Sequence, residues 1–135
     1  MRFPYVVSAD QRCVRVMMSD TVIGSDIAET IEAIYCDPLW QTGFDVVWDA
    51  SRTKRFMVEK QDHSNFVNLQ YKFPTSWGGR DILVIPQATD FNKARKYALR
   101  TAGSPREVHV VRTEAEANHI LGRHLRSDSP VYQPV

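Results

Sequence analysis

The feature that most constrains the fold is the apolar run at residues 44–51, Phe-Asp-Val-Val-Trp-Asp-Ala-Ser. The run is too short for a helix and is rich in β-branched and aromatic side chains, which is typical of a buried strand. It ends in polar residues, Asp49 and Ser51. The carboxyl edge of an open α/β sheet is where such folds bind ligands and partners. The run therefore predicts a central strand that leads to an open edge.

The rest of the chain alternates between strand and helix patterns. Residues 5–7 and 13–18 predict an antiparallel hairpin, because a short polar turn separates them. Two more apolar runs, 81–85 and 107–111, predict further strands. Apolar residues recur at intervals of three and four residues in the segments between and after these strands, which predicts helices. The helical segments are 26–37, 57–73, 88–102 and the stretch from Thr113.

Local signals support the ends of these helices. Asp26, with Glu29 three residues later, is predicted to cap the first helix, and Pro38 is predicted to end it. Gly103 follows the third helix as a left-handed cap residue. The segment 113–116, Thr-Glu-Ala-Glu, is a capping box. The first half of the second helix is almost wholly polar, so we expect it to be exposed or to lie under a partner.

This order of elements predicts a single α/β domain. The sheet has four to five strands and is mostly parallel, with an antiparallel N-terminal hairpin and about four helices around it. A chain of 135 residues suits one domain. We expect the domain to span residues 1–126 and residues 127–135, which contain two prolines, to form a flexible tail.

Composition excludes several classes of partner. The formal net charge of +1 gives no field that would attract nucleic acid. No run reaches the roughly 20 apolar residues of a membrane span, and the amino terminus lacks the apolar core of a signal peptide. Two cysteines do not make a disulfide framework, so we expect Cys13 and Cys36 to be reduced in a cytoplasmic protein. An acidic segment, 26–37, and a basic one, 93–100, suit a homodimer or a charged protein partner, or are two solvated helix faces.

The order of elements, together with the runs 46–49, 82–86 and 110–117, resembles the STAS-like (SpoIIAA-like) family of small bacterial proteins over about residues 3–125. The resemblance implies a four- or five-stranded sheet surrounded by helices. Relatives include anti-sigma factor antagonists and lipid-binding domains of the SEC14 type. The antagonists carry a phosphorylatable serine in an Asp-Ser-Ser-Gly-like motif after the central strand. Residues 56–59 take that place here and contain no serine, threonine or glycine. We therefore do not expect the phosphoserine switch.

No pattern in the sequence predicts catalysis. Asp49 at a strand end resembles the phosphate-accepting aspartate of response-regulator receivers, but the acidic pair and the lysine of that chemistry are missing, so we expect Asp49 to cap a turn. The four histidines form no pair at metal-ligand spacing, which argues against a metal site. They are His63, His109, His119 and His124. We expect a non-enzymatic protein without a cofactor.

Two functional hypotheses remain. The first is a regulatory module that binds a protein partner through the carboxyl edge of the sheet. Its surface would contain Asp49, Ser51, Arg52, Thr53, Lys54, Gln87 and Thr89. The alternative is a small apolar-ligand (lipid) binding protein, in which aromatic residues around the second helix leave a groove against the sheet instead of filling an ordinary core. Its groove would contain Phe56, Phe66, Phe73 and Trp77.

Overall fold

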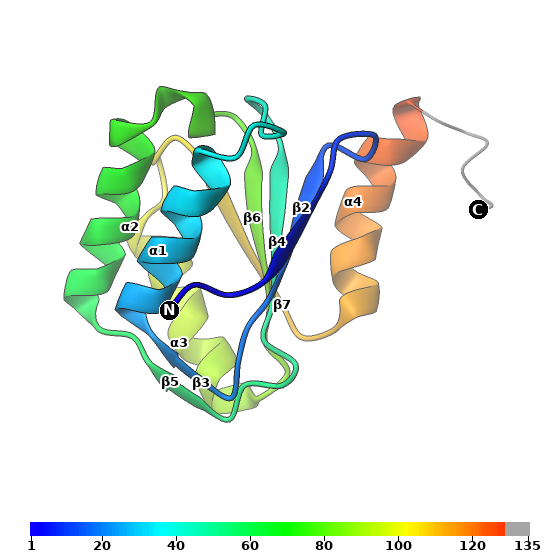
Figure 1. Ribbon diagram of the computed structural model, residues 1–135. Helices are drawn as coiled ribbons and strands as arrows, with labels where there is room; N and C mark the ends of the chain where they lie inside the picture. The colour runs from blue at the N-terminus through cyan, green and yellow to red at the C-terminus, as the bar shows by residue number, and fades with distance from the viewer. Residues whose placement is uncertain (129–135) are drawn as a thin grey trace.

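The computed structural model describes residues 1–128, and the side chains of residues 1–122. A five-stranded sheet forms its centre (Figure 1), with the strand order β1-β2-β4-β6-β7. β1 pairs antiparallel with β2, and the other pairings in this sheet are parallel. The predicted α/β domain, with an N-terminal hairpin and a mostly parallel sheet, is confirmed. The strands are β1 (Tyr5–Ser8), β2 (Cys13–Met17), β4 (Asp45–Asp49), β6 (Arg80–Val84) and β7 (Glu107–Val111).

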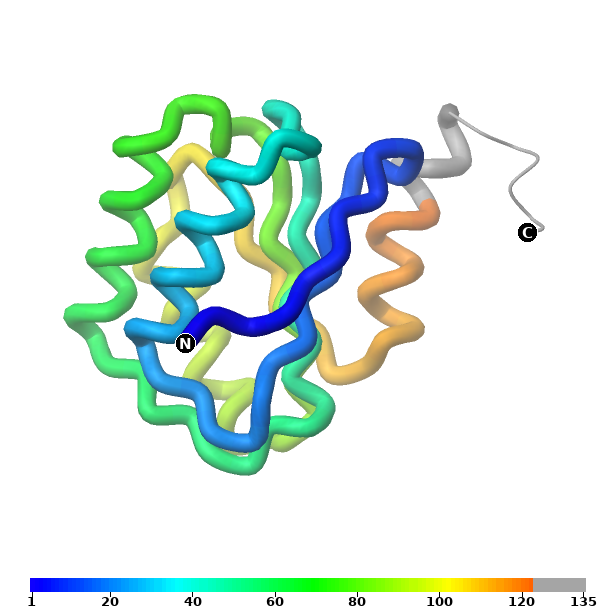
Figure 2. The backbone as a smooth tube through the Cα atoms, in the orientation of Figure 1, coloured from blue at the N-terminus to red at the C-terminus, as the bar shows by residue number. Residues whose placement is uncertain are grey.

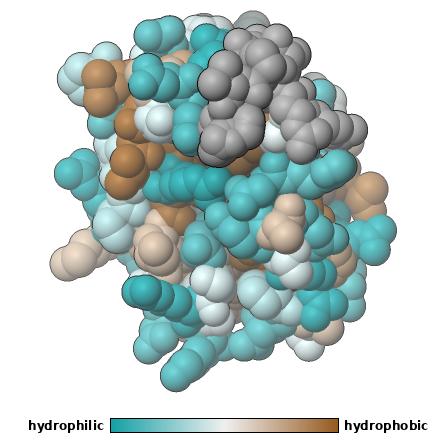
Figure 3. All heavy atoms as spheres, turned by 90° about the vertical axis from the view of Figure 1, so that its right-hand side faces the viewer, coloured by the Kyte–Doolittle hydropathy of each residue, from teal (hydrophilic) through white to brown (hydrophobic). Residues whose placement is uncertain are grey.

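Helices cover the two faces of this sheet unequally. α1 (Gly24–Tyr35), α2 (Lys60–Lys72) and α3 (Ala88–Arg100) lie on one face, and α4 (Glu114–Asp128) lies on the other. The backbone trace in Figure 2 shows the same two layers of unequal thickness. The visible surface on the α4 side is mostly hydrophilic, with apolar side chains scattered over it (Figure 3). The larger of the two clusters of buried apolar residues lies on the three-helix side.

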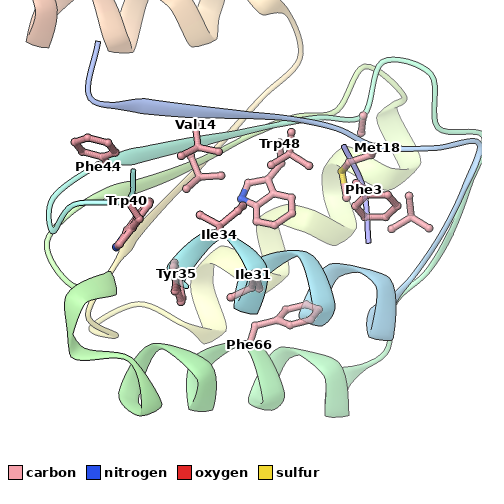
Figure 4. Packing of buried hydrophobic residues seen from close by; sticks show 14 of the residues in the cluster. Phe3, Val14, Met18, Ile31, Ile34, Tyr35, Trp40, Phe44, Trp48 and Phe66 are labelled. Carbon is pink, nitrogen blue, oxygen red and sulfur yellow. The ribbon is translucent and has the colours of Figure 1, made fainter. Parts of the chain in front are cut away.

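Strand β4 contributes to both cores. Successive side chains of a strand point to opposite faces, so Val46 and Trp48 belong to the cluster under α1–α3 and Val47 to the cluster under α4. Figure 4 shows Trp48 reaching from the sheet toward Ile31 and Ile34 of α1. Val46, Val47 and Trp48 are 1%, 0% and 5% exposed. The predicted central strand is confirmed.

Two predicted helix signals are also confirmed. At the start of α4, the backbone N–H of Glu116 donates to Oγ1 of Thr113 at 3.1 Å, and the backbone N–H of Thr113 donates to Oε1 of Glu116 at 3.1 Å. These reciprocal bonds satisfy two helix-end donors. After α3, Gly103 has φ of +89°, a left-handed conformation that favours glycine.

The predicted cap of α1 is wrong. The helix begins at Gly24, two residues before Asp26, and Ile23 precedes it in an extended conformation without a side-chain cap. Asp26 lies in the first turn and accepts a hydrogen bond from the amino-terminal ammonium group. A side chain at position 24 would overlap the carboxyl group of Asp62 in α2, so the glycine permits the close approach of the two helix starts.

The sequence did not reveal a second, small sheet. Strands β3 (Thr21–Ile23) and β5 (Arg55–Met57) pair in parallel. The sequence predicts a helix from residue 57, but residue 57 ends β5 and α2 begins at Lys60. Three residues are too few to display an alternating pattern. A short 3₁₀ helix, η1 (Pro74–Ser76), follows α2.

The end of the domain also differs from the expectation. Helix α4 continues to Asp128, so residues 127 and 128 belong to it and not to a tail. Ala117 and Leu121 of this helix are buried against the sheet, as its periodicity predicted. The remaining residues of the expected tail, 129–135, lie outside the part of the chain that the structure describes.

Candidate functional site

The carboxyl edge of the sheet carries exposed polar residues from two loops. Ser51, Arg52 and Lys54 follow β4, and Gln87 and Thr89 lie at the start of α3 after β6. The backbone pairing of β4 with β6 brings the two strand ends together. Five of the seven residues predicted for a partner surface are thus exposed at one end of the sheet.

Asp49 and Thr53 have different roles. Oδ1 of Asp49 accepts a hydrogen bond from the backbone N–H of Ser51 at 2.9 Å, so this carboxylate stabilises the turn after β4 and is half-buried. Thr53 is 2% exposed, and its hydroxyl donates to the backbone oxygen of Ser19 at 2.8 Å. The prediction that Thr53 contributes to an exposed surface is wrong, because the hydroxyl joins the β4 loop to the loop after β2.

The small sheet extends this surface with apolar side chains. Ile23 is paired with Met57, and Thr21 with Arg55, so all four side chains point the same way. Ile23 is 37% and Met57 51% exposed. We call Arg52, Lys54, Arg55, Ile23 and Met57 the outer strip. It combines positive charge with exposed apolar side chains.

A cavity of about 220 Å³ lies on the three-helix side, and side chains from α1, α2, α3 and the sheet line it. Most of its walls are apolar. From α1 and the sheet come Ile27, Ile31, Trp48, Leu83 and Ile85, among others, and from α2 and α3 come Phe66, Ala94 and Tyr97. Burial, and then the negative charge of Asp81, raise the pKa of Tyr97, so its phenol stays protonated at neutral pH.

The four aromatic residues predicted for a groove divide into two pairs. Phe56 and Phe66 line the cavity. Phe73 packs on Tyr35, with ring centroids 5.9 Å apart. Trp77 is 42% exposed, and its Nε1 donates to the backbone oxygen of Gln70 at 2.9 Å. Phe73 and Trp77 therefore pack around the C-terminal end of α2 and do not line the cavity.

Basic side chains surround the opening of the cavity. Lys60, Lys93, Lys96 and Arg100 line it and are exposed, so they lie where it meets solvent. Nη1 of Arg100 lies 3.4 Å from Nδ1 of His63. Burial, and then the charge of Arg100, lower the pKa of His63, so the imidazole is neutral at neutral pH and Nδ1 can accept this hydrogen bond.

At the opposite end of the sheet lies a buried charge cluster that the sequence did not reveal. Arg106 is 1% exposed, and its Nε donates to Oδ2 of Asp81 at 3.1 Å. Asp45, also buried, accepts three hydrogen bonds from Arg80, one from the backbone N–H and two from the guanidinium. An arginine thus neutralises each of these buried carboxylates. We therefore interpret both pairs as structural contacts that stabilise the sheet.

Other titratable groups offer little chemistry. Burial raises the pKa of the Cys13 thiol to about 11, so it is protonated at neutral pH. Among the residues whose side chains are described, no group of three or more His, Cys, Asp or Glu side chains could hold a metal ion. Within the same part of the chain, no helix is long and apolar enough to cross a membrane.

Comparison with known proteins relates the chain to others through its fold. No family model and no curated protein sequence matches it. Among solved structures, the anti-sigma factor antagonist SpoIIAA in its unphosphorylated form matches over 90% of this chain and 97% of its own, with a TM-score of 0.53 and 13% sequence identity. The chain therefore has the SpoIIAA-like, or STAS-like, fold that its element order predicted.

Proposed function

We propose that this chain is a non-enzymatic regulatory module that binds a partner protein through the carboxyl edge of its sheet. The observation that carries the proposal is the exposure of the outer strip and of Ser51, Gln87 and Thr89, which follow the neighbouring strands β4 and β6. Solved structures of this fold include an anti-sigma factor antagonist, which supports a regulatory role.

The chemistry of the outer strip suits an acidic partner. Arg52, Lys54 and Arg55 form no ion pair with a carboxylate among the described side chains. Ile23 and Met57 lie beside them and are exposed. Arginine and methionine are enriched in protein interfaces, and complementary charge speeds association. We therefore expect a partner with carboxylates around an apolar contact.

Regulation would not follow the phosphoserine scheme of the antagonists. Residues 56–59, where the resemblance places that motif, form part of β5 and the turn into α2, and they include no hydroxyl side chain. The absence of catalysis is supported by the roles of the polar groups. Asp49 caps a turn, Asp45 and Asp81 pair with arginines, and Cys13 is a buried thiol.

The test is a comparison of charge-reversed variants in a pull-down. The double variant Arg52→Glu, Lys54→Glu should lose every protein that wild type captures specifically from a lysate of the source cell. The control, Lys72→Glu, changes a lysine at the far end of α2 and should keep them. Capture that survives in the double variant, or that is lost equally in the control, contradicts the proposal.

A further inference from the structure

The cavity described above is large enough for part of a small molecule. Its volume is about 220 Å³. An engineered apolar cavity of about 150 Å³ takes up benzene, so on the same scale this one holds about nine carbon atoms. A whole phospholipid would not fit. The size indicates a short chain or a single substituted ring.

The opening of the cavity favours a negative charge. Lys60 from α2 and Lys93, Lys96 and Arg100 from α3 meet there. None of the four forms an ion pair with a carboxylate among the side chains that the structure describes. Two acidic side chains belong to the cavity lining: Asp90 on α3, and Asp81, which pairs with Arg106. Cations gathered at the mouth of an apolar site attract an anionic group.

The lining also contains an unsatisfied acceptor. Gln70 is 2% exposed and lines the cavity, and its Oε1 has no hydrogen-bond partner among the described residues. A buried acceptor without a donor costs free energy, so it is normally satisfied. Lys60 and Gln70 are ten residues apart in α2, which at 1.5 Å per residue separates their backbones by about 15 Å. The cavity therefore has cations at one end and an acceptor near the other.

We propose that this cavity binds a small amphipathic carboxylate. The apolar chain lies against Phe56, Phe66 and Tyr97, and the carboxylate meets the lysines and Arg100 at the opening. A hydroxyl at the far end of the chain donates a hydrogen bond to Oε1 of Gln70. The proposal goes beyond partner binding and does not depend on it, because it rests on residues other than those of the outer strip.

The experiment uses the full chain and three probes, octanoate, 8-hydroxyoctanoate and octan-1-ol, with binding measured by titration calorimetry. Octanoate should bind more tightly than octan-1-ol, and the hydroxyl should improve affinity about three- to tenfold. Lys93→Glu, Lys96→Glu should weaken octanoate binding by about tenfold, whereas Arg95→Glu, on the same helix but outside the lining, should not. Ala94→Phe should abolish binding by filling the cavity. Gln70→Leu should remove the preference for the hydroxyl.

Each contrary result overturns the proposal. Equal binding of octan-1-ol and octanoate, or equal losses in the lysine variant and the Arg95 control, would remove the role of charge. Unchanged octanoate affinity in Ala94→Phe would show that octanoate binds outside this cavity. Should Ala94→Phe fail to fold, the lysine variant decides, since both of its positions are exposed and exposed substitutions usually change stability little. A lack of octanoate binding overturns this proposal and leaves the partner-binding proposal intact.

Discussion

Replacing Arg106 by methionine should cost the protein a large share of its stability. The guanidinium has four acceptors: Oδ2 of Asp81 at 3.1 Å and the backbone oxygens of Ser76, Phe44 and Arg80 at 2.6, 3.0 and 2.9 Å. These groups come from η1 and from the starts of β4 and β6. Methionine fills much of the volume but leaves the carbonyls without this donor and the Asp81 carboxylate without its counter-charge.

The magnitude follows from the burial of the pair. Removing one partner of a buried ion pair costs about 3–5 kcal/mol, because the other charge remains in a poorly solvated site. A domain of this size has a total unfolding free energy of about 5–15 kcal/mol. Arg106→Met should therefore bring the protein close to the limit of folding. Arg95→Met, at an exposed position, should change the free energy by about 0.5 kcal/mol or less.

Urea denaturation followed by tryptophan fluorescence and by circular dichroism measures this change, provided that the two transitions coincide. A double-mutant cycle with Asp81→Asn isolates the pair. The asparagine can still accept the hydrogen bond from Nε1 of Trp48, which is 3.2 Å long in the wild type. The double variant should be less destabilised than the sum of the singles by about 1–3 kcal/mol. A cost below about 1 kcal/mol for Arg106→Met, or additive effects, would refute the reasoning.

Two further predictions concern the glycines and the cysteines. Gly24→Ala should lower the unfolding free energy by about 1–3 kcal/mol, because the new methyl group overlaps Asp62. Gly122→Ala, at a helical site with open space, should raise it by about 0.5–1 kcal/mol. Urea denaturation measures both changes, and equal shifts in the two variants would contradict the overlap. At pH 8 a thiol reagent should label the exposed Cys36 quickly and the buried Cys13 only after unfolding. The reason is that burial hides the Cys13 thiol and raises its pKa to about 11. Equal labelling rates would show that Cys13 is accessible in the folded protein.

The sequence predicted the elements whose signals are local. The strand at residues 44–51, the capping box at Thr113 and the turn at Gly103 each depend on residues that are neighbours in the chain, so periodicity and turn chemistry suffice to find them. The alternation of strands and helices predicted that the pairings of β2 with β4 and of β4 with β6 are parallel, but it did not predict which strands are neighbours.

What the sequence could not show depends on residues that meet only in space. Arg106 and Asp81 are 25 residues apart, and in the sequence each resembles an ordinary charged residue at the start of a strand. Thr53 lies in a basic loop, yet its hydroxyl is buried against the loop after β2. The sequence could not show that Phe56 lines the cavity while Phe73 packs outside it, because the positions of both side chains depend on where β5 ends and α2 begins. Three-residue strands give no pattern from which to predict this boundary.

Strand β5 lies between the two proposed surfaces. Because side chains alternate along a strand, Phe56 lines the cavity while Arg55 and Met57 are exposed in the outer strip. β5 has only three residues and pairs with β3, so we expect a ligand that moves Phe56 to move the exposed side chains on either side of it as well. Partner affinity, measured with and without saturating octanoate, shows whether this coupling exists. We expect a change, and by linkage the partner must then alter octanoate affinity by the same factor. A partner that binds equally in both conditions would show that β5 holds its position when the cavity fills.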